Sequence, residues 1–183
     1  ADSNIGIILG EKSGHLVDLD FDIPEARALS GLPYFFASLP AFRRTSSVPN
    51  APGHRVLRCT DAPNEVVKFD FRGQKETAAI AALDLPKSVI LEVRAGNGQT
   101  IFPPSTIDDD KLVWDAEKLD LPVWQWEELR RRAGLLAFSA FAAACYPAEG
   151  NRDNFCFLLA GTLVHAGVDA EVAEQIILAI AEL

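Results

Sequence analysis

Three aspartates near the start of the chain alternate with apolar residues and have the spacing of a metal site. They are Asp18, Asp20 and Asp22. Successive side chains of a β-strand point to opposite faces, so the three carboxylates would share one face and the apolar residues the other. Carboxylates this close repel one another unless a cation neutralises them, and oxygen-only ligands suit Mg²⁺ or Mn²⁺. The pattern therefore predicts a strand that holds a divalent metal ion.

The alternative interpretation is a strand that ends here and leaves its acids in solvent. Asp22 precedes Ile23-Pro24, where a strand would stop, and we assign it to that group. Asp18 and Asp20 then remain as the candidate metal ligands.

His54 is the second candidate, at the entrance to an alternating strand in Pro52-Gly53-His54-Arg55. The preceding loop carries Arg43 and Arg44. Together with Arg55 they form a basic cluster that could hold a triphosphate by charge-assisted hydrogen bonds. The alternative is a histidine that is structural or simply exposed.

Glu92 is the third candidate. In Leu91-Glu92-Val93-Arg94, alternation places Glu92 and Arg94 on one strand face. One interpretation is a cross-strand ion pair on a solvated face, which contributes little. The other makes Glu92 a third carboxylate for the Asp18/Asp20 metal, with Arg94 near the substrate phosphates.

The rest of the sequence predicts strands first and helices last. Apolar or alternating runs predict strands at residues 5–9, 16–21, 54–59, 66–71, 88–94 and 99–102. Turn residues 10–14 predict that the first two strands form a hairpin or are closely linked, and Asn97-Gly98 predicts a hairpin of the last two. Residues 40–53 read as a loop. Helices are expected at residues 24–29, 126–146, 154–166 and 170–183. This order is typical of an α+β domain followed by a small helical module.

Composition excludes several classes of protein. The net charge of −9 argues against non-specific coating of nucleic acid, although basic residues gather in the middle of the chain. Three cysteines without metal-ligand spacing fit a reducing cytoplasm. The longest apolar stretch, residues 134–146, is too short for a bilayer, so we expect no membrane partner.

Taken together, these motifs resemble the archaeo-eukaryotic primase superfamily. The strand with Asp-x-Asp is followed by Gly-His-Arg and then by a specific string from Glu92 to Ser105, Glu-Val-Arg-Ala-Gly-Asn-Gly-Gln-Thr-Ile-Phe-Pro-Pro-Ser. The sequence looks most like the bifunctional primase–polymerase domains of plasmids, phages and integrated elements, over residues 4–114. Residues 146–152 and the two helices after them resemble the helical segment that follows the catalytic domain in many such proteins.

The resemblance implies an RRM-like catalytic core with a mixed or antiparallel sheet. It implies that Asp18, Asp20 and Glu92 are catalytic and hold two Mg²⁺ or Mn²⁺ ions. It implies that His54 contacts the phosphates of the incoming nucleotide. Further nucleotide contacts are expected because of their charge and their proximity to these motifs; they are Arg55, Arg94 and Gln99. On the same grounds, Arg43 and Arg44 are possible template or phosphate contacts.

The resemblance also predicts two domains. The first is a primase–polymerase core over residues 1–115, truncated at its N-terminus because the family's helix and strand before residue 4 are missing. The second is a helical module over residues 116–183. The sequence departs from many relatives at Thr106-Ile107-Asp108, where they carry a histidine after Pro-Pro-Ser.

The predicted function is template-directed nucleotidyl transfer by two metal ions, in the replication of a mobile element or phage. The expected partners are a single-stranded DNA template, nucleoside triphosphates and a replicative helicase domain or protein. Two alternatives remain open. One is a catalytically inactive replication module that binds DNA or a partner. The other is a metal-dependent nuclease that uses the same carboxylates with water as the nucleophile.

Overall fold

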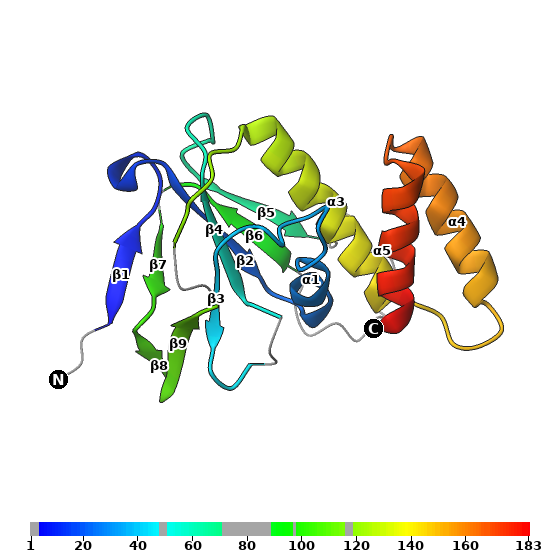
Figure 1. Cartoon of the computed structure of the whole chain (residues 1–183), viewed down its shortest axis with the longest axis horizontal. Helices are drawn as coiled ribbons and strands as arrows, with labels where there is room; N and C mark the ends of the chain where they lie inside the picture. The colour runs from blue at the N-terminus through cyan, green and yellow to red at the C-terminus, as the bar shows by residue number, and fades with distance from the viewer. Residues whose placement is uncertain (1–3, 48–50, 71–88, 97, 116–118) are drawn as a thin grey trace.

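Two antiparallel sheets and a set of helices form an α+β structure, as predicted (Figure 1). The computed structural model describes residues 4–47, 51–70, 89–96, 98–115 and 119–183. The strands are β1 (Ile5–Ile8), β2 (Leu16–Phe21), β3 (Ala41–Arg44), β4 (His54–Arg58), β5 (Val66–Asp70), β6 (Val89–Arg94), β7 (Gln99–Phe102), β8 (Thr106–Ile107) and β9 (Asp110–Trp114). The helices are the short 3₁₀ turn η1 (Glu11–Ser13), α1 (Pro24–Leu29), α3 (Trp126–Ala144), α4 (Arg152–His165) and α5 (Ala170–Glu182).

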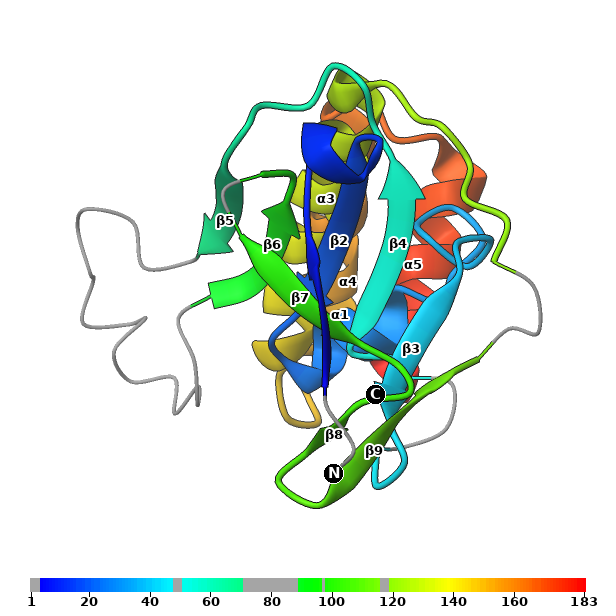
Figure 2. The same ribbon diagram turned by 90° about the vertical axis from the view of Figure 1, so that its left-hand side faces the viewer.

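The large sheet has β2 near its middle. Its order is β5-β6-β2-β4-β3-β9-β8, so β2 pairs with β6 on one side and with β4 on the other. The small sheet consists of β1 and β7. Figures 1 and 2 show this small sheet on one side of the large sheet and the helices on the other. The large sheet is therefore the middle layer.

Because side chains alternate along β2, its two faces carry different residues. Val17, Leu19 and Phe21 are fully buried in the core between the sheet and the helices. Leu16 belongs to a second, smaller core on the face toward β1 and β7. The aspartates of β2 lie on this second face, as the period of two requires.

Helix α3 covers the helical side of the sheet. Its residues Leu129, Ala133 and Leu136 are fully buried in the same cluster as Val17 and Leu19 of β2. Helices α5 and α4 lie beyond it (Figure 1). Thus α3 forms a layer over the sheet, and the predicted division between residues 115 and 116 stays a prediction.

Of the two arrangements predicted for the first two strands, the hairpin is wrong, and the strands are closely linked through η1 instead. β1 pairs with β7, with Ile5 opposite Phe102, and meets the start of β2 only through a bridge between Gly10 and Leu16. Both edges of β2 are occupied by β4 and β6, which leaves no edge for β1.

The predicted hairpin at Asn97-Gly98 is also wrong as a strand pair. β6 lies in the large sheet between β5 and β2, while β7 lies in the small sheet. With both of its edges paired, β6 cannot accept β7. Asn97 itself, like residue 71 and residue 88 at the ends of two predicted strands, lies outside the described residues.

Three strands were not predicted. β3 falls inside the expected loop at residues 40–53, and β8 and β9 form a small hairpin after the two prolines. β3 pairs with β4 and with β9, so these strands extend the large sheet beyond β4. The four expected helices are present within a few residues of their predicted ends. In the part of the chain that is described, no helix is long and apolar enough to cross a bilayer.

Candidate functional site

The strand pairing of β2 places the predicted acids and histidine next to one another. Asp20 lies directly opposite Glu92 on β6 and opposite His54 on β4. Asp18 lies opposite Arg94. Residues directly opposite each other on paired strands share a face, so these five side chains form one group.

Asp18 lies at the bottom of this group and is fully buried. The Nδ1 atom of His54 lies 3.2 Å from each of its two carboxylate oxygens. Thr100 of β7 donates its hydroxyl to Oδ2 of Asp18 at 2.7 Å. The buried carboxylate thus has a partner from each of the two sheets.

Asp20 and Glu92 share a cation. Arg94 Nε donates to Glu92 Oε2 at 2.9 Å, and a terminal nitrogen of the same guanidinium pairs with Asp20. Lys68 Nζ lies 2.7 Å from Glu92 Oε1. His54 Nδ1 also lies 3.7 Å from Asp20 Oδ1, so acids and bases alternate across the floor of the site.

Burial and charge shift several pKa values in this group. Burial raises the pKa of Asp20, and the Asp18 charge raises it further, against the opposing effect of His54. Burial lowers the pKa of His54, but the Asp18 carboxylate outweighs it, so the pKa of His54 is raised. Burial raises the pKa of Glu92, but bonds from Lys68 and Arg94 outweigh it, so the pKa of Glu92 is lowered. The site therefore favours an imidazolium at His54 and an ionised Glu92.

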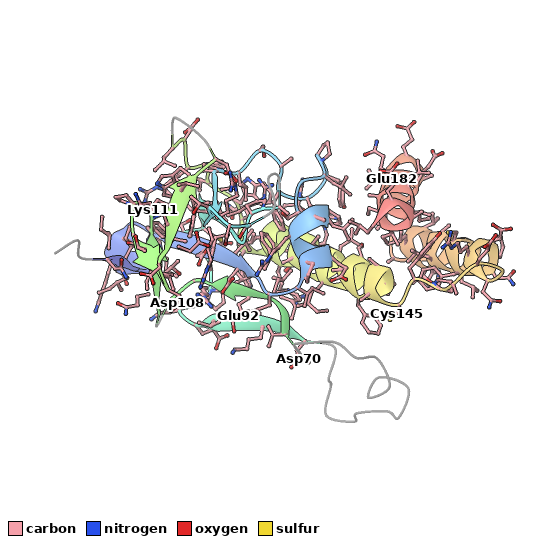
Figure 3. The ribbon with its side chains drawn as sticks, turned by 90° about the horizontal axis from the view of Figure 1, so that it is seen from below. Asp70, Glu92, Asp108, Lys111, Cys145 and Glu182 are labelled. Carbon is pink, nitrogen blue, oxygen red and sulfur yellow. The ribbon has the colours of Figure 1, made fainter. Side chains whose placement is uncertain are left out.

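A cleft of about 370 Å³ opens above this floor. Its lining includes eight of the predicted or newly found polar residues, Asp20, Arg27, Arg43, Arg44, His54, Arg94, Gln99 and Thr100. Figure 3 labels Glu92 on β6 and Asp108 on the β8–β9 hairpin, which flanks this region. The cleft combines the carboxylate of Asp20 with several guanidinium groups, which is a suitable environment for a phosphate-bearing ligand with a metal ion.

Arg43 and Arg44 reach the cleft from β3. Arg43 Nε lies 2.9 Å from Asp115 Oδ1, and Arg44 lies 3.7 Å from Asp108 Oδ2. Their place in a strand, rather than in the predicted loop, comes from the pairing of β3 with β9.

Arg55 is not brought to this group. It follows His54 in β4, so its side chain points to the opposite face of the sheet and is buried there. Its guanidinium donates to the backbone carbonyls of Phe36 and Leu39 at 2.8 and 3.1 Å and to the hydroxyl of Ser30 at 3.2 Å. Burial lowers the pKa of Arg55 to about 10. The structure thus places Arg55 where it holds the segment after α1.

Sequence reasoning missed two residues of the site. Arg27 of α1 lines the cleft, and its Nε donates to the carbonyl of Phe21 at 2.9 Å. Within the described residues, no carboxylate pairs with it. Thr100 was missed because a threonine in a strand is ordinary, and only the position of β7 reveals its bond to Asp18.

The donor set has the chemistry that a divalent ion requires. Asp18, Asp20 and Glu92 offer oxygen ligands from adjacent strands. In the arrangement of the described residues, no three acidic, histidine or cysteine side chains converge as a metal-binding group. The carboxylates are instead paired with Arg94, Lys68 and His54. These residues fit a metal by donor type, and its binding requires that Arg94 and Lys68 give way from Asp20 and Glu92.

Comparison with known proteins identifies a family for this chain. A family model described as bifunctional DNA primase/polymerase, N-terminal, matches residues 1–126. A search of the curated proteins and a search of the solved structures returned no match. The matched range contains both sheets and the whole cleft, and it ends at the first residue of α3.

Proposed function

Because this chain belongs to the family of bifunctional DNA primase/polymerases, we propose that its cleft binds a nucleoside triphosphate and transfers the nucleotide to a strand on a single-stranded DNA template, with release of pyrophosphate. The family implies nucleotidyltransferase chemistry with DNA and nucleotides as substrates, as the motifs predicted. The observation that carries the proposal is the cleft itself, which Asp20 and His54 line together with Arg27, Arg43, Arg44 and Arg94. Replication of a mobile element or phage, and a helicase partner, stay predictions.

Asp18, Asp20 and Glu92 are the proposed ligands of Mg²⁺ or Mn²⁺. Two such ions, when bound, activate the attacking 3′-hydroxyl and neutralise the charge that develops on the leaving pyrophosphate. Arg94 and Lys68 neutralise Asp20 and Glu92 in the structure described here. Arg94 also lines the cleft, so once released from these carboxylates it would be available to the phosphates of the nucleotide.

His54 is the proposed phosphate contact on the floor of the cleft. Its Nδ1 is bonded to Asp18, so Nε2 is the ring nitrogen left for a ligand. An imidazolium donates from both nitrogens, and the raised pKa of His54 favours that form. His54 would therefore donate Nε2–H to a phosphate oxygen.

The direct test of the proposal is primer extension. The purified chain, a primed single-stranded template, nucleoside triphosphates and Mn²⁺ are expected to yield elongated strands, and EDTA is expected to abolish them. Degradation of labelled DNA without nucleotides would support the nuclease alternative instead. DNA binding without elongation or degradation would support the inactive replication module.

Arg27→Ala is expected to raise the KM for the nucleoside triphosphate about tenfold or more, because a hydrogen bond to a charged group contributes about 1.5–3 kcal/mol. Arg27 lines the cleft without a carboxylate partner in the described part of the chain, so its guanidinium is available to an anion. Steady-state kinetics with increasing nucleotide concentration measures the effect.

Arg130→Ala is the matched control for charge. Arg130 is an exposed residue of α3, and its nearest acid, Glu127, lies at 3.9 Å. Its removal takes away one positive charge far from the cleft and is expected to leave KM unchanged. An equal rise of KM in both variants would mean that general charge, and not a contact with Arg27, governs nucleotide binding.

A further inference from the structure

We infer that Thr100 and Phe42 are positioning residues that fix the imidazole of His54 for the phosphates, an inference that rests on the proposed function of the cleft. Neither residue stands out in the sequence. Thr100 acts through Asp18, and Phe42 acts by direct ring contact.

Thr100 holds the carboxylate that holds the histidine. A fully buried carboxylate is unfavourable without hydrogen-bond donors, and Asp18 receives one from Thr100 at 2.7 Å. His54 Nδ1 lies on the same carboxylate at 3.2 Å. Thr100 is itself buried, so water does not compete with Asp18 for its hydroxyl. The chain of contacts runs from β7 through β2 to β4 and links the two sheets at the site.

Phe42 fixes the plane of the imidazole. Its ring stacks on that of His54 with a centroid distance of 4.5 Å and an interplanar angle of 3°. Phe42 is fully buried and packs edge-on against Phe102 and Trp114 at 5.0 and 5.1 Å. The imidazole therefore rests on a ring that cannot easily move.

The two contacts leave one orientation for His54. Asp18 requires a proton on Nδ1, which sets the hydrogen-bonding role of each ring nitrogen, and Phe42 sets the ring plane. Nε2 then faces the cleft at a fixed position. Preorganised contacts of this kind raise the affinity for a ligand because less freedom is lost on binding.

Thr100→Val and Thr100→Ser separate the hydroxyl from the packing. Valine keeps the shape of threonine without the hydroxyl, and serine keeps the hydroxyl. We expect Thr100→Val to raise the KM for the nucleotide about 10- to 100-fold, the range for loss of an outer-shell partner. Thr100→Ser is expected to stay within about threefold of the unchanged chain, since its hydroxyl still reaches Asp18.

NMR of the histidine rings supplies a readout that is independent of activity. The chain has three histidines, so ¹⁵N labelling gives few ring signals, and His54→Ala identifies those of His54. The unchanged chain is expected to show a downfield Nδ1–H proton of His54 that is protected from exchange. In Thr100→Val this proton is expected to broaden or disappear, and in Thr100→Ser to persist.

Phe42→Leu tests the stacking separately, and it keeps the inference testable if the valine variant does not fold. Without the aromatic partner, the ring-current shifts of the His54 ring protons are expected to change, and KM is expected to rise. An unchanged His54 spectrum in both Thr100→Val and Phe42→Leu would overturn the inference, as would a serine variant as impaired as the valine variant. A chain that shows the protected proton but makes no DNA would support the positioning and refute the proposed function.

Discussion

Asp20→Asn is expected to reduce nucleotide incorporation by about 10²–10³-fold, the range for removal of one preorganised electrostatic contact to a transition state. Asparagine keeps the shape of the side chain and removes its charge. Of the three proposed metal ligands, Asp20 is the one that lines the cleft, where it pairs with Arg94. Primer extension under single-turnover conditions measures the rate, and Mn²⁺ electron paramagnetic resonance measures metal binding in the same variant. Both are expected to weaken together.

Asp22→Asn is the matched control, because it removes the same charge two residues further along the same segment. Asp22 lies beyond the end of β2, and its backbone N–H donates to Ile90. Asp22 is half-buried and does not line the cleft, so its replacement is expected to leave incorporation within about twofold. Full activity in Asp20→Asn would remove this residue from the proposed metal site. Equal loss in both variants would point to the total charge of the segment.

Arg55→Ala is expected to lower the free energy of unfolding by about 3 kcal/mol, because it removes buried hydrogen bonds made by a charged group, which contribute about 1.5–3 kcal/mol each. The substitution would leave the carbonyls of Phe36 and Leu39 and the hydroxyl of Ser30 without the guanidinium that binds them. For a chain of this size the loss corresponds to a fall in melting temperature of about 6–12 °C. Circular dichroism during heating measures it.

The same variant tests the earlier expectation that Arg55 binds the nucleotide. Its place on the far side of β4 predicts that the folded fraction keeps the KM of the unchanged chain. Arg130→Ala again serves as the control and is expected to stay within about 0.5 kcal/mol in stability. A stable Arg55→Ala variant with a raised KM would reverse the assignment and return Arg55 to the site.

The shared face of the carboxylates could be predicted from the sequence because it depends on local alternation alone. Asp18 and Asp20 follow the period of two, and β2 forms where it was expected. The same rule, applied to His54 and Arg55, would have separated these neighbours. The sequence analysis grouped them by charge instead and so predicted Arg55 as a nucleotide contact, but the structure does not bring Arg55 together with His54.

The strand partners could not be predicted because they depend on contacts between distant segments. The turn at Gly98 gave a local hairpin signal, but β6 was already paired on both sides by β5 and β2. β7 therefore joined β1, and this pairing brought Thr100 to Asp18. The arginines of β3 reached the cleft for a similar reason, through a partner strand seventy residues later that no local pattern announced.

Because both faces of β2 are in use, its pairing register cannot shift without damage to the structure. Its odd-numbered side chains fill the core beneath α3, and Asp18 and Asp20 serve the opposite face. A shift of one residue against β4 or β6 would drive both carboxylates into the apolar core and turn Leu19 toward the cleft. The pairing on both edges prevents that exchange. Evolution can therefore vary the surrounding loops in length, but an insertion within these six residues would destroy core and site together.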